Sequence, residues 1–337
     1  MRLTKDLLVR FAKNHVAERL QEKPRPVCIY LTGSLCTDDF LLGGTADIDL
    51  IFIHNVQPVM DRELIPVTPD VHLDIWHYDV TLFNQPRELR RDAWIGSFMC
   101  ENPLVLHDAG HWFEFTQASA CALFYRPENC LSRAQPFIDS ARQKWIECFS
   151  GTHRPGVFTL RTYLRCIEDA ANALSCLISV PLSERRMVQQ FSKRAQAAGK
   201  PSLTDMLIEL ITSSALNDEK ASAWQQTLQE TLTQVGKLPN CPIQLSNPRQ
   251  AYLLHAAKSL VESSPANALW IILRNWTEAA VFLPAASPEV QKWEEMVQEL
   301  ELSPEFYTDR LEMLDHFLEE IEAYFDHFKE QNSLTSD

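Results

Sequence analysis

Residues 46–53 read Ala-Asp-Ile-Asp-Leu-Ile-Phe-Ile, and this stretch decides the fold of the first part of the chain. The run is short, rich in β-branched and aromatic residues, and typical of a strand. Successive side chains of a strand point to opposite faces, so Asp47 and Asp49 must project from the same face. The sequence therefore predicts a strand that presents two carboxylates together.

Two further strands are predicted, one before and one after this stretch. Residues 27–34 read Val-Cys-Ile-Tyr-Leu-Thr-Gly-Ser, and residues 71–76 read Val-His-Leu-Asp-Ile-Trp. Asp74 stands between two apolar residues of the later strand, where its carboxylate can converge with the other two. His72 shares the face of Asp74 by strand alternation, and it either lines the same site or is a buried structural histidine.

The convergence of three carboxylates predicts a metal site. Like charges repel one another unless cations lie between them. Mg²⁺ is usually held by a few carboxylates and substrate phosphates, and two such ions can clamp the attacking and leaving oxygens of a phosphoryl displacement. Asp47, Asp49 and Asp74 are therefore candidate ligands of two Mg²⁺ ions. Gly33 lets the backbone approach a phosphate, which N–H groups and the Ser34 hydroxyl can then hold.

This ordered set of residues resembles the polymerase β-type nucleotidyltransferase superfamily. The match consists of a strand ending in Gly-Ser, Asp-x-Asp on the next strand and a lone Asp between apolar residues, within about residues 20–125. The resemblance implies that the three acidic residues are catalytic and hold two Mg²⁺ ions. It also implies that the Gly-Ser pair contacts a nucleoside triphosphate, with ATP the expected nucleotide. Residues 35–46 contain no Lys or Arg, although many relatives carry a basic residue there.

The composition restricts the class of protein. The formal net charge of −14 disfavours nucleic acid as a partner, because such binding depends on Lys and Arg. No run of 18 apolar residues occurs, so we expect no membrane span. The nine cysteines include no Cys-x-x-Cys pair, so a zinc site is not expected. A reduced, cytoplasmic protein is the simplest account of these cysteines.

The rest of the first part predicts helices around these strands. Residues 3–20 have the apolar spacing of an amphipathic helix. Residues 87–94 read as a helix and residues 103–107 as a last strand, with Asp108 as a turn residue after it. A loop containing three prolines is expected to precede the strand of Asp74; they are Pro58, Pro66 and Pro69.

From about residue 125 onward the pattern is helical. The predicted helices cover residues 132–149, 158–179, 183–198, 203–213, 219–235, 247–263, 265–281, 287–301 and 303–330. Ser287 and Ser303 each precede a proline and read as helix N-caps. We therefore expect an α+β fold, in which a mixed sheet flanked by helices is followed by an all-α part. The predicted domains are a catalytic domain, 1–125, and a helical domain, 126–337, that binds the acceptor, mediates oligomerisation, or both.

One helix of the second part carries a polar stripe. Arg161, Arg165, Glu168 and Asn172 fall on one side of it at helical spacing. In antibiotic-modifying nucleotidyltransferases a helical domain supplies substrate contacts and sometimes a carboxylate base. The resemblance therefore makes Glu168 or Asp169 a candidate general base. The alternative is an exposed helix face with ion pairs within the helix.

Two other features of the second part carry hypotheses. Residues 126–200 hold 12 Lys and Arg against 6 Asp and Glu, which either supply counter-charge for a triphosphate or form a solvated surface. The final helix has an apolar stripe that is core or a subunit contact, so homo-oligomerisation stays open. Arg310 and His316 loosely resemble the spacing in HEPN ribonucleases. Their side chains would lie about 240° apart on one helix, which makes a poor active site.

These observations predict a Mg²⁺-dependent nucleotidyltransferase. It would move a nucleoside monophosphate from a nucleoside triphosphate to an acceptor hydroxyl and release pyrophosphate. A small-molecule acceptor, such as an aminoglycoside-like cation, suits the acidic helical part and follows the resemblance. Two alternatives stay open. The acceptor is a macromolecule, either a protein side chain or an RNA end, or the chain is a catalytically silent member that binds nucleotide or a partner.

Overall fold

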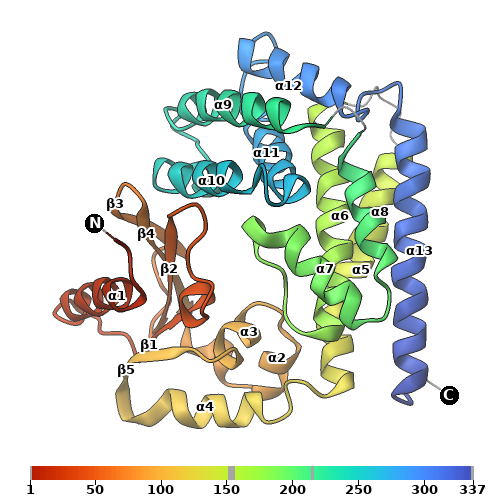
Figure 1. The fold of residues 1–337 in the computed structure, drawn as a ribbon. Helices are drawn as coiled ribbons and strands as arrows, with labels where there is room; N and C mark the ends of the chain where they lie inside the picture. Colours follow the sequence, from red (N-terminus) through yellow and green to blue (C-terminus); the bar gives the residue numbers. More distant parts are fainter. Residues whose placement is uncertain (1, 151–155, 214–215, 335–337) are drawn as a thin grey trace. The chain divides into compact units, whose positions relative to one another are not determined.

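The computed structural model describes residues 2–150, 156–213 and 216–334. The chain divides into two compact units, Met1–Asn129 and Cys130–Asp337. Strands occur in the first unit, and the described part of the second unit is helical (Figure 1). The predicted fold class, a mixed sheet flanked by helices and followed by an all-α part, is confirmed.

The first unit contains a five-stranded sheet with the strand order β3-β4-β2-β1-β5. Strands β2 and β4 are parallel, whereas the other neighbouring pairs are antiparallel. The strands are β1 (Cys28–Thr32), β2 (Ala46–His54), β3 (Arg62–Thr68), β4 (Val71–Asp79) and β5 (Leu104–Asp108). The pairing places the two strands that carry the acidic residues next to each other at the centre of the sheet.

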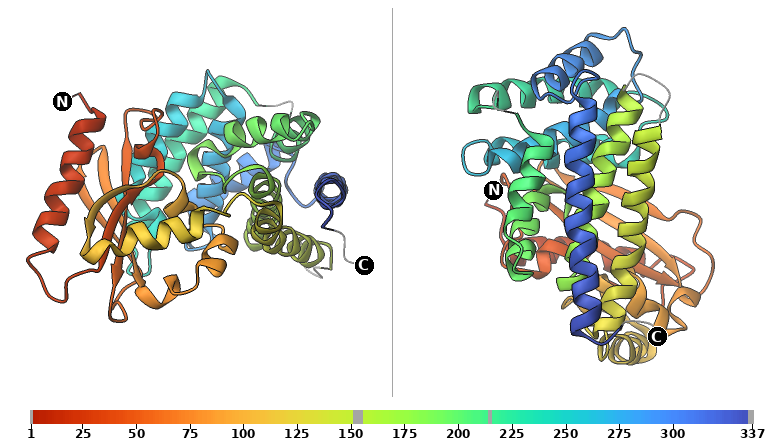
Figure 2. Two further views of the ribbon diagram at one scale, coloured as in Figure 1. Left: turned by 90° about the horizontal axis from the view of Figure 1, so that it is seen from below. Right: turned by 90° about the vertical axis from the view of Figure 1, so that its right-hand side faces the viewer.

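Helices cover both faces of this sheet (Figure 2). Helix α1 (Lys5–Arg19) begins at Thr4, whose side chain accepts a hydrogen bond from the N–H of Leu7, and it packs its apolar side on one face. Helices α2 (Pro86–Arg91), α3 (Ile95–Cys100) and α4 (Trp112–Cys121) pack on the other face. Each face therefore has its own apolar core, and the Asp-bearing positions belong to the face covered by α2, α3 and α4.

Strand β3 was not expected. The sequence predicts a proline-containing loop here, but Arg62–Thr68 pairs antiparallel with β4. Pro66 is compatible with this strand because β3 lies at the edge of the sheet, where one side of the backbone needs no partner. The pairing shifts register between Pro66 and Thr68. This edge strand brings a cation, Arg62, beside the predicted site.

The described part of the second unit follows the predicted helices closely. Its helices are α5 (Pro127–Ser150, which starts in the first unit), α6 (Val157–Ile178), α7 (Met187–Ala197), α8 (Ser202–Ile211), α9 (Asp218–Val235), α10 (Asn247–Leu260), α11 (Pro265–Ala280), α12 (Pro288–Glu299) and α13 (Tyr307–Gln331). Helix α13 runs alongside α6 and α8 (Figure 2). Short 3₁₀ segments occur at Gly33–Cys36, Val80–Phe83, Ala109–His111, Glu184–Arg186 and Ile243–Leu245.

Three details of the helices differ from or extend the predictions. Ser287 caps α12 as predicted, since its side chain accepts from the N–H of Val290. Ser303 caps no helix: it begins a turn in which its carbonyl accepts from Phe306, and α13 starts only at Tyr307. Helices α3 and α4 were not predicted. Within the described residues, no helix has the length and apolar character needed to cross a membrane.

Two cysteines form a disulfide. Cys100 at the end of α3 is bonded to Cys121 at the end of α4, with their Cα atoms 5.4 Å apart. The expectation that all nine cysteines are reduced is therefore wrong for this pair. Their spacing of 21 residues is unremarkable in the sequence, and only the packing of α3 against α4 brings them together.

Candidate functional site

The strand register brings the predicted acidic residues together. In the parallel pair of β2 and β4, Asp49 is the partner of Asp74, and Asp47 is the partner of His72. Register partners on neighbouring strands project from the same face of a sheet. Asp47, Asp49 and Asp74 therefore share one face, as the alternation of the sequence predicts.

The Gly33 backbone lies against one of these carboxylates. Thr32, the last residue of β1, is the register partner of Asp49. Gly33 follows with φ of +73°, and a Cβ placed on it would lie 1.9 Å from Oδ2 of Asp49. A side chain would thus collide with the carboxylate and strain the backbone, so this position requires glycine.

Ser34 is the second predicted phosphate-binding residue. It lies in the 3₁₀ turn Gly33–Cys36, which directly follows β1. Its hydroxyl is buried and has no hydrogen-bond partner among the described residues. An unsatisfied buried hydroxyl is costly, so this one is a donor available to a bound oxygen ligand.

The acidic residues differ in burial. Asp74 is 2% exposed and Asp47 is 7% exposed, whereas Asp49 is half-buried. His72, the partner of Asp47, is 1% exposed and belongs to the buried interior. Burying carboxylates without a compensating cation is strongly unfavourable. The site therefore needs positive charge close to Asp74 and Asp47.

A cation from β3 meets this need at Asp74. Nε of Arg62 donates to Oδ1 of Asp74 at 2.8 Å, and Nη2 donates to Oδ2 at 2.5 Å. The guanidinium also lies 4.5 Å from the centre of the Trp76 ring. This bidentate pair is the strongest arrangement that a carboxylate and an arginine can make. Sequence reasoning missed Arg62, because its segment reads as a loop.

These contacts bear on the predicted magnesium site. Carboxylate oxygens suit a hard divalent cation, and Asp47 and Asp49 offer them from one strand. Within the described ranges, no group of three His, Cys, Asp or Glu side chains is placed to hold a metal ion. A physical reason lies at Asp74, where both oxygens accept hydrogen bonds from Arg62. The three carboxylates therefore suit such an ion by their chemistry, and Asp74 can join it only if Arg62 moves.

Helix α3 is bonded to the end of the strand that leads into the site. The hydroxyl of Thr32 donates to the carbonyl of Phe98, and the disulfide ties the end of the same helix to α4. Burial raises the pKa of the Cys36 thiol, and the nearby charge of Asp49 adds to the rise. Cys36 is thus a neutral thiol next to the site, rather than a thiolate ligand.

A second polar cluster lies on the opposite face of the sheet, under α1. Nε2 of His54 and Nδ1 of His77 are 2.9 Å apart, and Nε2 of His77 is 3.0 Å from Oε1 of Glu63. Arg19 of α1 donates to the same Glu63 oxygen at 3.1 Å. Burial lowers the pKa of both histidines, so the neutral rings are favoured. No pattern in the sequence singles out this cluster.

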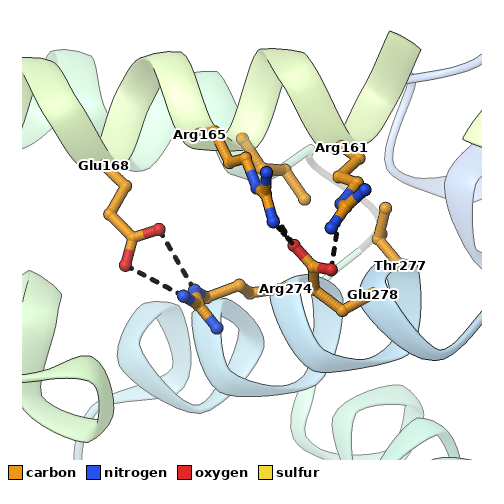
Figure 3. Close-up of a pocket in the computed structure, with 7 residues that line it drawn as sticks. Arg161, Arg165, Glu168, Arg274, Thr277 and Glu278 are labelled. Atoms are coloured by element: carbon orange, nitrogen blue, oxygen red, sulfur yellow. Dashed lines mark hydrogen bonds and ion pairs between the residues drawn. The ribbon is translucent and has the colours of Figure 1, made fainter. Parts of the chain in front are cut away.

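The polar stripe of α6 pairs with another helix. Arg161 and Arg165 both contact the carboxylate of Glu278 on α11, at 2.9 Å each (Figure 3). Glu168 contacts Arg274, also on α11, at 3.2 Å. The charged residues of the stripe therefore form ion pairs between two helices, and not within one helix as in the alternative. Its partners lie about a hundred residues away along the chain, beyond the reach of helical spacing.

Both candidate general bases are engaged in the second unit. Glu168 is held by Arg274, as described above. Asp169 contacts Nζ of Lys144 at 2.6 Å and accepts from the hydroxyl of Ser140 at 2.7 Å. These contacts favour a packing role for Glu168 and Asp169.

Other cations of the second unit are also engaged. Arg142 pairs with Asp315 and Glu322 of α13, and Lys200 pairs with Glu320. The basic excess of residues 126–200 is thus partly neutralised by the acidic final helix. Arg310 is buried and donates to the carbonyls of Glu209, Thr212, Leu300 and Glu301. His316 is exposed, so the pair does not form an active site.

Comparisons with known proteins leave the family open. No family model matches the chain, and no curated protein matches it. Among solved structures, the chain is similar to the crystal structure of a nucleotidyltransferase-like protein from Exiguobacterium sibiricum. The identity is 9%, the TM-score is 0.32, and the match covers 88% of this chain and 89% of that one. A likeness this slight carries no functional argument, which therefore rests on the residues of the site.

Proposed function

We propose that this protein is a nucleotidyltransferase that moves a nucleoside monophosphate from a nucleoside triphosphate to an acceptor hydroxyl. The proposal rests on the juxtaposition of Asp47, Asp49 and Asp74 on one face of two parallel strands, beside the Gly33 backbone. In the reaction, the acceptor oxygen attacks the α-phosphorus, the bond to the β-phosphate oxygen breaks, and pyrophosphate leaves.

Each residue has a role in this proposal. Asp47 and Asp49 would hold two Mg²⁺ ions, and Asp74 would join at the ion nearer the acceptor oxygen. Bound Mg²⁺ supplies charge neutralisation and makes the acceptor hydroxyl more acidic. The Gly33 backbone and the Ser34 hydroxyl would hold the β- and γ-phosphates. The Ser34 hydroxyl suits this role because no described residue bonds to it. Positioning and electrostatics would carry most of the catalysis.

The acceptor is proposed to be a small molecule. The overall charge of −14 suits a cationic acceptor and disfavours an RNA end. ATP is the nucleotide proposed first. Because Glu168 and Asp169 are held in ion pairs, deprotonation of the acceptor is assigned to the acidic site of the first unit and not to the second unit.

A second candidate function has one specific observation in its favour. The bidentate pair between Arg62 and Asp74 engages the third acidic residue, and a protein in which this pair never opens would bind nucleotide or a partner without catalysis. The two candidates differ in one measurable property. An active enzyme releases pyrophosphate with some acceptor, whereas a silent protein releases none with any acceptor.

The test is incorporation of label from α-³²P-labelled nucleotides. Wild type is incubated with Mg²⁺, each of the four nucleotides, and acceptors of three classes: cationic small molecules, the protein itself, and RNA. The Asp47→Asn/Asp49→Asn double variant measures background. Label in a small molecule that is absent with the variant supports the proposal. Label in protein or RNA would overturn the acceptor, and no label in any class would favour the silent candidate.

A further inference from the structure

The Arg62–Asp74 pair is placed where a metal ion and a phosphate would both act. Asp74 offers both its oxygens to Arg62, and its side chain is 3% exposed. In this state neither oxygen is available to a divalent cation without loss of a charged hydrogen bond. The guanidinium and a cation at Asp74 are therefore competitors for the same carboxylate.

Arg62 is the more accessible partner of the pair. Its side chain is 18% exposed, and β3 is an edge strand in which every residue is half-buried or exposed. Asp74 instead lies on an inner strand paired on both sides. The ring of Trp76 beneath the guanidinium offers a surface over which an arginine can shift while keeping a favourable contact. Of the two partners, Arg62 is the one that can leave.

The guanidinium has an alternative partner if a nucleotide binds. A planar guanidinium forms the same two-pronged contact with a phosphate as with a carboxylate. Residues 35–46 provide no Lys or Arg after the Gly-Ser pair. Arg62 is a cation of the first unit that directly contacts one of the three acidic residues.

We infer that Arg62 exchanges partners. It holds Asp74 in the metal-free protein and passes to the phosphates of the nucleotide when a divalent cation takes Asp74. This inference rests on the proposed function, and it assigns Arg62 as a positioning residue for the metal and a ligand of the nucleotide. It accounts for a third acidic residue whose two carboxylate oxygens are both held by an arginine.

The inference predicts effects of opposite sign from one substitution. In Arg62→Gln, Mn²⁺ measured without nucleotide should bind about tenfold more tightly than in wild type, since the competing cation is gone. The Mn²⁺ complex of ATP should bind about tenfold more weakly, since a phosphate ligand is gone. A merely structural role for Arg62 would weaken both.

The matched control is Arg19→Gln. Arg19 also pairs with a carboxylate of β3, Glu63, but on the opposite face of the sheet. Loosening of β3 alone would therefore affect both variants equally. Adding Asp74→Asn to Arg62→Gln should abolish the gain in Mn²⁺ affinity, because the carboxylate that the metal gains is removed.

The experiment is titration of Mn²⁺ by electron paramagnetic resonance and of Mn²⁺-ATP by calorimetry, on the full chain and on folded variants. The exchange would be supported if Arg62→Gln, but not Arg19→Gln, bound Mn²⁺ more tightly and Mn²⁺-ATP more weakly than wild type. Unchanged or weaker Mn²⁺ binding in Arg62→Gln, with a wild type that binds Mn²⁺, would overturn the exchange and leave the proposed function standing. No Mn²⁺ binding by wild type or any variant would overturn both.

Discussion

Gly33 and Asp49 are so close that a Cβ on the glycine would lie 1.9 Å from the Asp49 Oδ2 atom. This contact joins the turn after β1 to the acidic pair on β2. Position 33 has no room for any side chain. The glycine therefore sets where the Asp49 carboxylate can lie. The site depends on backbone position as much as on its acidic side chains.

Substituting Gly33 by alanine should disrupt the site. The positive φ costs about 1 kcal/mol for an L-residue, and displacement of Asp49 adds to this cost. We expect Gly33→Ala to lose nucleotide binding and to lower the unfolding free energy by about 2 kcal/mol or more. Gly110→Ala is the control, because φ there is +70° and no atom lies within 4 Å of the added Cβ. Equal losses in the two variants, measured by urea unfolding, would contradict the close contact.

Neutralising Asp74 should lower the stability of the protein, whereas neutralising Asp49 should not. Asp74→Asn leaves the mostly buried Arg62 guanidinium without its carboxylate and should cost about 3 kcal/mol of unfolding free energy. Asp49→Asn removes one of three crowded negative charges and should leave the metal-free protein as stable or slightly more stable. Urea unfolding in a chelating buffer measures both. A larger loss for Asp49→Asn than for Asp74→Asn would contradict this arrangement.

The paired histidines predict how stability depends on pH. Burial holds the pKa values of His54 and His77 below the ordinary value of 6.5, so the unfolded chain binds more protons near that pH. The contribution of the two neutral histidines to the unfolding free energy is fully present above pH 6.5. This contribution is lost as the pH falls below 6.5. The unfolding free energy should thus fall between pH 7.5 and 5.5, and fall less in His54→Gln/His77→Gln. The exposed His316→Gln is the control, and an unchanged slope in the double variant would contradict the prediction.

The ion pairs around Glu278 should contribute to the stability of the fold and not to nucleotide binding or catalysis. Glu278 is 4% exposed and balances two arginines of α6, which a neutral amide cannot do. Glu278→Gln should lower the unfolding free energy by about 3 kcal/mol, with nucleotide affinity unchanged in the folded protein. Glu230→Gln, which removes an exposed pair with Lys292, should cost under about 1 kcal/mol. Lost nucleotide binding with full stability in Glu278→Gln would instead assign the cluster to the site.

Much of the fold follows from local patterns in the sequence. Alternation locates β1, β2 and β4, and helical spacing locates the helices of the second unit within a few residues. Strand β3 was not predicted because its charged residues and Pro66 suit an edge strand, and the local sequence pattern does not distinguish an edge strand from a loop. The Cys100–Cys121 disulfide was not predicted because it depends on the packing of two helices against each other.

The candidate site was predictable as far as strand alternation reaches. It places Asp47 and Asp49 on one face, and the register of β2 and β4 adds Asp74 to that face. The partner of Asp74 was not predictable, since Arg62 reaches it from an unrecognised strand. Likewise, spacing identifies the stripe of α6, but only packing identifies Glu278 as its partner.

The most direct test of the central claim is calorimetric binding of ATP, GTP, CTP and UTP with and without Mg²⁺. It compares wild type with Asp47→Asn/Asp49→Asn and with Asp38→Asn/Asp39→Asn, which neutralises two exposed acidic residues nearby. With a metal site at Asp47 and Asp49, wild type and the control variant should bind at least one nucleotide only when Mg²⁺ is present. The Asp47/Asp49 variant should bind none. Mg²⁺-independent binding, or equal binding by all three proteins, would contradict a metal site at Asp47 and Asp49.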